Sequence, residues 1–301
     1  MTNCAFALIP EETEMTTIPR LNSVAKTLSE GGTAFVAFSP AEPGNALTIG
    51  EAPYDGVVYE MEHNPYDIRS LKECLLTMLN RRRIADSGSI AAPVAPMVRI
   101  PPNGGEMNQW FAKQVLDAGV YGVIWPHVST VEEARNAVAA CRYPRPTSSP
   151  YFEPAGIRGD SPRHAARYWG LTQQEYYQRA DVWPLNPDGE VIVGIMCEEV
   201  KAVRNLPKML KEVPGIGVVI IGEGDLSQDL GVPRQYNHPS VLSAIADVLA
   251  ICKEHNVVCG HPHVDKNNIE ALIEQGFRWL MPGPVPSHAA LELGRKAAKR
   301  A

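Results

Sequence analysis

Acidic side chains and a histidine stand directly behind apolar runs of this sequence. Glu60, Glu62 and His63 follow one run, and Glu198 and Asp225 each follow another. Ions such as Mg²⁺ and Mn²⁺ take one or two protein carboxylates and complete their coordination with water and substrate oxygens. Glu198 and Asp225 therefore suit a divalent cation, which a 2-oxo acid would chelate through its carboxylate and keto oxygens.

An arginine at the end of another apolar run supplies the positive charge that such chemistry needs. Arg99 would complement negative charge that develops on the keto oxygen, and His63, oriented by a neighbouring carboxylate, would move protons. Plainer interpretations are a structural ion pair for Arg99, a satisfied polar group for His63 and a helix cap for Asp225. Glu60 and Glu62 would lie on opposite faces of an extended strand, which predicts different roles for them.

The elements that would position these residues alternate along the chain. Eight β-rich runs are nearly all followed by helical patterns, and the clearest helical patterns cover residues 67–83, 129–142 and 239–255. Eight such units predict one (β/α)₈ TIM barrel over residues 1–301, and the lack of a G-x-G-x-x-G turn in the first unit argues against a dinucleotide fold. The expected strands cover residues 33–38, 56–61, 94–100, 120–125, 191–196, 216–221, 256–260 and 277–281.

In barrels of this kind, function collects at the carboxyl ends of the strands. One lip of the barrel would then carry more ionisable groups than the capping of helices and strands explains. The residues at the strand ends are Glu60, Glu62, His63, Arg99, Trp125, His127, Glu198, Glu199, Glu223, Gly224, Asp225, His261 and His263. The histidines His127, His261 and His263 would either contact metal or substrate or remain exposed at the rim.

One segment, residues 143–189, interrupts the alternation and is rich in proline and aromatic residues. A long loop inside a compact domain is usually functional or disordered. Because it holds so many aromatics, we interpret it as an ordered lid or a subunit contact. Its aromatic side chains would line a pocket for a bulky or aromatic aldehyde, or pack within the segment or an interface; they are Tyr151, Phe152, Trp169, Tyr176, Tyr177 and Trp183.

Composition excludes several classes of protein. The formal net charge of −6 indicates neither a nucleic-acid groove nor a basic membrane surface, and the one dense basic run, 81–83, closes a helical pattern. Six scattered cysteines without a C-x-x-C pair suggest small buried thiols in a reducing cytoplasm. Residues 1–15 turn acidic too early for a signal peptide, and no apolar run approaches the roughly 20 residues of a membrane helix.

Taken in order, several motifs resemble the HpcH/HpaI aldolase/citrate lyase family. Within it they are most similar to the metal-dependent (class II) pyruvate aldolases typified by 2,4-dihydroxyhept-2-ene-1,7-dioate aldolase. The motifs keep the order that they have in the family and lie between residues 60 and 231. The matching stretches are EMEH at 60–63, VRIP at 98–101, residues 116–138, RYP at 142–144 with GIRG at 156–159, and residues 198–206 and 214–231.

The resemblance implies roles for individual residues. Glu198 and Asp225 would hold the divalent ion, Mg²⁺ or Mn²⁺, with Co²⁺ and Zn²⁺ as further candidates. Arg99 would hold the keto or enolate oxygen, and His63, oriented by Glu60, would belong to the proton-transfer apparatus.

It also implies substrate contacts and an assembly. The backbone of Gly224 and Asp225 would meet the substrate carboxylate, and Trp125 would line the substrate site. Asp117 matches a position that reaches toward the neighbouring subunit's site, which implies sites near subunit interfaces. Members of the family usually form hexamers, so the resemblance also implies a hexamer. The type member of the family further implies a place in the breakdown of aromatic compounds.

The sequence departs from the family pattern at several of these positions. Glu60 stands where aspartate is usual, and His127 stands where methionine is common. Glu199 and Glu223 replace a usual threonine and proline beside the implied metal ligands. These changes leave the metal ligands in place and leave the identity of the substrate open.

We expect an aldolase that cleaves or forms a 4-hydroxy-2-oxo acid from pyruvate and an aldehyde, through a metal-stabilised pyruvate enolate. The alternatives are another lyase or synthase acting on the same enolate, such as an oxaloacetate decarboxylase, and a barrel that only binds a ligand. A Schiff-base aldolase is disfavoured because no expected strand contains a lysine; the nearest, Lys266, stands where a helix begins. The aldehyde, the pathway and the preferred metal stay open.

Overall fold

The computed structural model describes residues 19–101, 107, 109–283 and 288–300. Eight parallel strands form a closed ring, because β9 pairs with β1 and β4 pairs with β6. Each expected run forms one of these strands, so the predicted TIM barrel is confirmed. The strands are β1 (Ala34–Pro40), β2 (Gly56–Glu60), β3 (Ala95–Arg99), β4 (Gly122–Trp125), β6 (Val191–Cys197), β7 (Val218–Ile221), β8 (Val258–Val264) and β9 (Trp279–Pro282).

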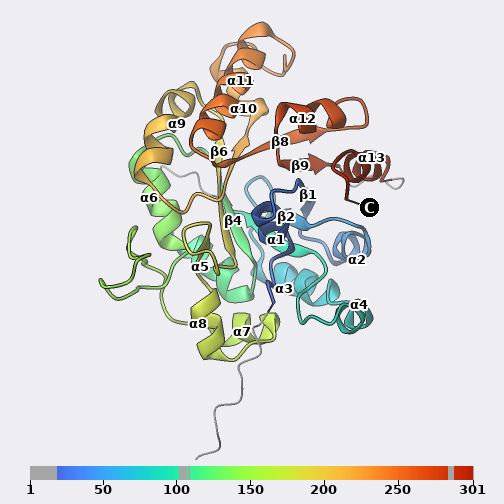
Figure 1. The fold of residues 1–301 in the computed structure, drawn as a ribbon, viewed down its shortest axis with the longest axis vertical. Coiled ribbons are helices and arrows are strands. Elements are labelled where there is room, and N and C mark those ends of the chain that lie inside the picture. Colours follow the sequence, from blue (N-terminus) through green and yellow to red (C-terminus); the bar gives the residue numbers. More distant parts are fainter. Residues whose placement is uncertain (1–18, 102–106, 108, 284–287, 301) are drawn as a thin grey trace, which may run out of the picture.

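Helices surround the strands, as Figure 1 shows. All seven residues of β6 are buried, as expected for a parallel strand covered on both faces. The helices are α1 (Ser23–Ser29), α2 (Pro43–Glu51), α3 (Ile68–Thr77), α4 (Arg81–Asp86), α5 (Gln109–Ala118), α6 (Val131–Ala140), α7 (Arg163–Trp169), α8 (Gln173–Arg179), α9 (Val200–Glu212), α10 (Glu223–Asp229), α11 (Pro239–Glu254), α12 (Ile269–Gln275) and α13 (Ala289–Ala297).

The structure corrects two expectations about local structure. The helix expected over 67–83 is two helices, and Asn80 caps the second through its side chain, so the arginines at 81–83 begin α4 instead of closing a helix. The histidines at 261 and 263 lie within β8, which extends to Val264, and not in a loop beyond it.

The segment 143–189 is ordered. It contains α7, α8 and the short strand β5 (Val182–Trp183), which pairs with β6. Trp169 and Tyr176 are fully buried, and the Trp169 ring stacks on Tyr121 of the barrel wall with centroids 4.5 Å apart. Trp169 and Tyr176 therefore pack the segment against the barrel, and neither of them lines a pocket for an aldehyde within this chain.

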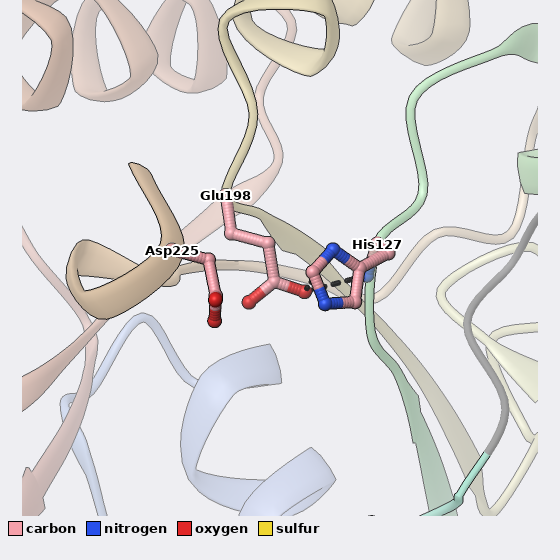
Figure 2. Close-up of side chains that lie close together, drawn as sticks. All are labelled: His127, Glu198 and Asp225. Atoms are coloured by element: carbon pink, nitrogen blue, oxygen red, sulfur yellow. Dashed lines mark hydrogen bonds and ion pairs between the residues drawn. The ribbon is translucent and has the colours of Figure 1, made fainter. Parts of the chain in front are cut away.

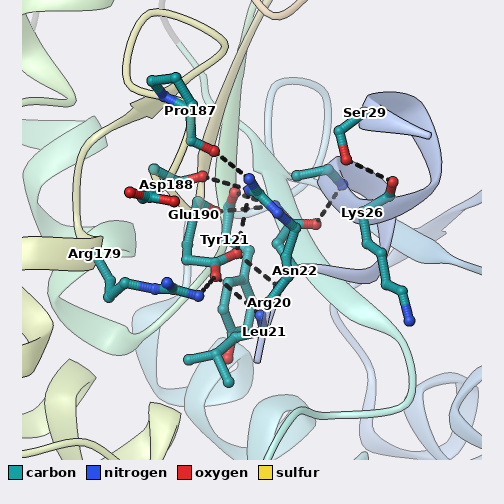
Figure 3. A network of polar contacts seen from close by, with 12 residues as sticks. Arg20, Leu21, Asn22, Lys26, Ser29, Tyr121, Arg179, Pro187, Asp188 and Glu190 are labelled. Carbon is teal, nitrogen blue, oxygen red and sulfur yellow. Dashed lines mark hydrogen bonds and ion pairs between the residues drawn. The ribbon is translucent and has the colours of Figure 1, made fainter. Parts of the chain in front are cut away.

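A buried carboxylate ties the start of the described chain to the amino-terminal end of β6 (Figure 3). Glu190 is fully buried and accepts hydrogen bonds from the backbone N–H groups of Leu21 and Asn22, each at 2.9 Å. Arg179 also donates to it, at 2.6 Å. The Asn22 side chain caps α1, so this network fixes that helix across the end of the barrel opposite the strand carboxyl termini.

One expectation drawn from composition is met within the described residues. All five described cysteines are buried and free, whereas Cys4 and the N-terminal stretch 1–15 lie outside the described residues. Among the helices of the described part, none is long and apolar enough to cross a membrane.

Candidate active site

The carboxyl ends of the strands surround a cavity of about 250 Å³. Its wall combines apolar side chains from the strands with polar and charged groups from the strand ends and from the segments that follow them. The apolar lining includes Phe38, Val58, Ile124, Met196, Ile220 and Met281. The polar lining includes Arg99, Glu198, Glu223, Asp225, Arg234, Tyr236 and His263.

Three residues form a group that fits a metal ion, and Figure 2 shows their side chains turned toward one another. His127 follows β4, Glu198 follows β6, and Asp225 lies in the first turn of α10. One ligand atom from each residue lies within 4.8 Å of the other two. One imidazole nitrogen and two carboxylates form a donor set suited to a divalent ion.

The Glu198 carboxylate is held by its surroundings. It is buried and accepts a hydrogen bond from the His127 backbone N–H at 2.5 Å. A Cβ atom at position 222 would lie 2.3 Å from Glu198 Oε2, so glycine is needed there for the carboxylate to occupy this place. Burial raises the pKa of Glu198, and a bound cation would offset that cost of ionisation.

His127 sits at the centre of the acidic residues. Its backbone φ is +54°, an uncommon conformation for a non-glycine residue, and its Nδ1 lies 3.1 Å from Glu199 and 3.7 Å from Glu198. Nε2 lies 3.8 Å from Glu62 Oε1. Burial lowers the pKa of His127, but these carboxylates outweigh it and the net pKa is raised.

Arg99 is paired with two carboxylates. It bonds Glu60 directly, and its Nη1 lies 3.0 Å from Glu62 Oε2. Glu60 also accepts hydrogen bonds from the backbone N–H groups of Glu62, at 2.7 Å, and His63, at 3.3 Å. The expectation that Glu60 and Glu62 face opposite ways is wrong, because β2 ends at Glu60 and the chain then turns, so that both carboxylates reach Arg99.

His63 lies at the rim of the site. Its side chain is 67% exposed and its Nε2 is 3.5 Å from Glu62 Oε2. Burial and the charge of Glu198 raise the pKa of Glu62, while Arg99 lowers it, with a net increase. Glu62 therefore lies between the exposed histidine and the interior of the site.

The structure does not bring all expected substrate contacts together. Gly224 lines the cavity, with open space where a Cβ would stand. Trp125 is fully buried and does not line the cavity, because the neighbouring Ile124 points there and successive strand residues face opposite ways. Asp117 lies on α5, where its carboxylate bonds Arg158 at 2.9 Å, away from the cavity of its own chain.

A second carboxylate–histidine cluster borders the cavity. Glu223 is buried and lies 2.9 Å from His261 Nε2, and it also bonds His263 Nδ1. Burial raises the pKa of Glu223. Hydrogen bonds from the two histidines outweigh this effect and lower the pKa to about 2. The sequence placed Glu223, His261 and His263 at strand ends but did not predict that they form a cluster. Nothing in the spacing of Arg234 or Tyr236 predicted that they line the cavity.

Comparison with known proteins identifies the class of protein that this barrel and site define. Residues 35–283 match the model of the HpcH/HpaI aldolase/citrate lyase family. A hydroxypyruvate/pyruvate aldolase from Roseobacter denitrificans is 29% identical over 261 residues, covering 86% of this chain and 90% of that protein. A 5-keto-4-deoxy-D-glucarate aldolase from Salmonella newport is 32% identical over 220 residues, or 73% of each chain.

A solved structure shows the same likeness. A family protein from Burkholderia cenocepacia has a TM-score of 0.72 and 26% identity, covering 92% of this chain and 98% of that one. The chain therefore belongs to the HpcH/HpaI aldolase/citrate lyase family. It is a carbon–carbon lyase, an aldolase on a TIM barrel, as the motifs predicted.

Proposed function

We propose that the protein is a class II pyruvate aldolase, which cleaves a 4-hydroxy-2-oxo acid into pyruvate and an aldehyde. The observation that carries this proposal is the convergence of His127, Glu198 and Asp225, two of which line the same cavity as Arg99, namely Glu198 and Asp225. The three residues offer ligands for a metal ion, and Arg99 offers a positive charge nearby. A developing enolate is stabilised by both features.

Glu198, Asp225 and His127 are the proposed metal ligands. A divalent ion held by these residues would supply a Lewis acid for the keto oxygen of the 2-oxo acid. Because an imidazole nitrogen joins the two carboxylates, the donor set favours Mn²⁺, Co²⁺ or Zn²⁺ over Mg²⁺, which prefers oxygen ligands and water.

The remaining side chains hold charge and move protons. Arg99 stabilises negative charge on the oxygen of pyruvate when the bond between C3 and C4 breaks, and Glu60 fixes both Arg99 and the turn that follows β2. Glu62, with a raised pKa, and His63 at the rim carry the proton of the 4-hydroxyl toward solvent. The backbone at Gly224 contacts the substrate carboxylate.

The assembly and its setting stay proposals. A hexamer would place Asp117 near the site of a neighbouring subunit, and light scattering after size-exclusion chromatography measures the mass directly. A cytoplasmic location is a prediction from the cysteine pattern, and a role in the breakdown of aromatic compounds is a prediction from the resemblance alone.

The test is turnover of pyruvate with an aldehyde panel. Glu198→Ala and Asp225→Ala should each abolish metal-dependent exchange of the C3 protons of pyruvate in D₂O, and EDTA should do the same to the parent protein. Exposed Asp247→Ala, on α11, is the matched control and should retain exchange. Full activity in EDTA contradicts the proposal, and product analysis with oxaloacetate distinguishes a decarboxylase from an aldolase.

A further inference from the structure

Glu199 stands at the start of α9, but its side chain does not cap that helix. A side chain at this position usually accepts a hydrogen bond from a backbone N–H group of the first turn. Here the Val200 N–H donates to Asp229 Oδ2 at 2.7 Å, and the Glu199 carbonyl accepts from the Val203 N–H at 3.1 Å. The helix therefore fixes the backbone of Glu199 and leaves its carboxylate for contacts elsewhere.

The Glu199 carboxylate contacts two residues of the loop that follows β4. Its Oε1 lies 3.1 Å from His127 Nδ1, and its Oε2 accepts a hydrogen bond from the Ser129 hydroxyl at 2.5 Å. Glu198 Oε1 also lies near His127 Nδ1, but its distance of 3.7 Å is too long for a hydrogen bond. Among the described residues, Glu199 is therefore the hydrogen-bond partner of this imidazole nitrogen.

Ser129 holds the second carboxylate oxygen from a fixed position. The serine is buried, its N–H donates to Glu133 Oε2 at 2.6 Å, and its carbonyl accepts from Asn205 Nδ2 at 2.8 Å. Asn205 lies on α9, the helix that follows Glu199, so this contact ties the loop after β4 to that helix. Because both of its oxygens are held, the Glu199 carboxylate has little freedom to rotate, although its side chain is 34% exposed.

The contact with Glu199 determines which nitrogen of His127 is free to face an ion. A neutral imidazole carries one proton, and a carboxylate beside Nδ1 favours the tautomer that has the proton there. Nε2 then keeps its lone pair. It lies 3.8 Å from Glu62 Oε1, and no described residue forms a hydrogen bond with it. Figure 2 shows the carboxylates of Glu198 and Asp225 on one side of the His127 ring.

We infer that Glu199 is a positioning residue, which holds His127 in the Nδ1–H tautomer so that Nε2 is the nitrogen that binds the divalent ion. In metal sites a carboxylate commonly orients a histidine ligand in this way, and it also makes the imidazole a better donor. The inference deepens the proposed aldolase function and rests on it, because Glu199 has this role only if His127 is a metal ligand.

Binding of Co²⁺ tests the inference without turnover. Glu199→Ala should weaken Co²⁺ binding about tenfold, the lower end of the range for partners in the outer shell of a metal site, because the carboxylate is partly exposed. Mg²⁺ binding should weaken by a smaller factor. Glu199→Gln should bind Co²⁺ within about threefold of the parent, since its amide oxygen still accepts from Nδ1–H. Glu132→Ala removes an exposed carboxylate from the first turn of α6 and is the matched control, which should bind like the parent.

Two further measurements show whether Glu199 acts through His127. In the His127→Asn background, Glu199→Ala should weaken Co²⁺ binding by less than about threefold, because the side chain that it positions is absent. In the Zn²⁺-loaded protein, long-range ¹H–¹⁵N correlation spectra should show the His127 proton on Nδ1, and the spectrum of His127→Asn identifies this signal. Glu199→Ala should shift that proton upfield, as expected when a hydrogen bond to a carboxylate is lost.

The outcomes separate this inference from the proposed function. The role of Glu199 is refuted, while the metal site stands, if Glu199→Ala binds Co²⁺ like the parent, weakens Co²⁺ and Mg²⁺ by the same factor, or leaves Zn²⁺ bound through Nδ1 as in the parent. An equal loss in Glu132→Ala, or an undiminished effect of Glu199→Ala in the His127→Asn background, indicates a general effect of charge and refutes the role as well. If His127→Asn changes neither the affinity for Co²⁺ nor its spectrum, His127 is not a ligand, and that part of the proposed function fails together with the inference.

Discussion

Replacement of His127 by asparagine should weaken the binding of Co²⁺ and Zn²⁺ much more than the binding of Mg²⁺. His127 has a φ of +54°, a region that asparagine tolerates well, and its contact to Glu198 through the backbone N–H does not depend on the side chain. The variant therefore removes the imidazole and leaves Glu198 and Asp225 in place.

The size of the effect follows from the ligand count. Loss of a partner in the outer shell of a metal site typically weakens binding about 10- to 100-fold, so loss of one of three direct ligands should reach about 100-fold for Co²⁺ or Zn²⁺. That corresponds to about 2.7 kcal/mol. Mg²⁺ prefers oxygen ligands and readily keeps its water, so we expect its affinity to change by less than about threefold.

The assay is competition between the protein and a chromophoric chelator for Co²⁺, Zn²⁺ and Mg²⁺. The visible spectrum of the Co²⁺ form reports independently on whether an imidazole nitrogen is bound. His164→Asn, which changes an exposed histidine on α7, is the matched control and should bind all three ions like the parent. An equal loss of affinity for Mg²⁺ and Co²⁺, or an unchanged Co²⁺ spectrum, would refute a role for His127 as a ligand.

Three other experiments test features of the site and of the fold. Gly222→Ala should weaken Mg²⁺ and Co²⁺ binding alike, by about tenfold, because the added Cβ displaces the Glu198 carboxylate; unchanged titrations would contradict this. Glu190→Ala should lower the free energy of unfolding in urea by about 3–5 kcal/mol, since Arg179 loses its buried partner, and a change under 1 kcal/mol would argue against the network. Iodoacetamide at pH 8 should leave the five buried cysteines unlabelled in the native protein, because burial raises the thiol pKa of Cys74 to about 11 and of Cys141 to about 12; mass spectrometry checks this, and unfolded protein is the control.

The barrel was predictable because its signals are local and repeated. Each strand is a short apolar run, and the order of the runs alone determines which strand ends meet at one lip of a parallel barrel. Glu198 and Asp225 were found together for this reason, although they are 27 positions apart in the chain.

The directions of individual side chains were less predictable. The sequence does not show where β2 ends, so Glu60 and Glu62 were expected to face apart, whereas the turn after Glu60 brings both to Arg99. Trp125 was placed at the lip because it ends β4, but the alternation of the strand turns its ring away from the cavity.

Residues from loops were the hardest to find. Arg234 reaches the cavity through a backbone hydrogen bond to Ser227 and a positive φ, and neither is encoded in a recognisable spacing. His127 carried a weak signal, its departure from the family's methionine, but only the fold shows that it meets the two carboxylates.

The excess of carboxylates over arginines in this cavity has a kinetic consequence. The lining of the cavity carries three carboxylates, Glu198, Glu223 and Asp225, against two arginines, and one of these, Arg99, is already paired with Glu60 and Glu62. Salt screens charges within one cavity only weakly, because the Debye length is about 8 Å at physiological ionic strength. An anionic 2-oxo acid would be repelled from such a cavity until a divalent cation offsets this charge. Binding would therefore be ordered, with the cation entering first and leaving last, so that one ion serves many turnovers.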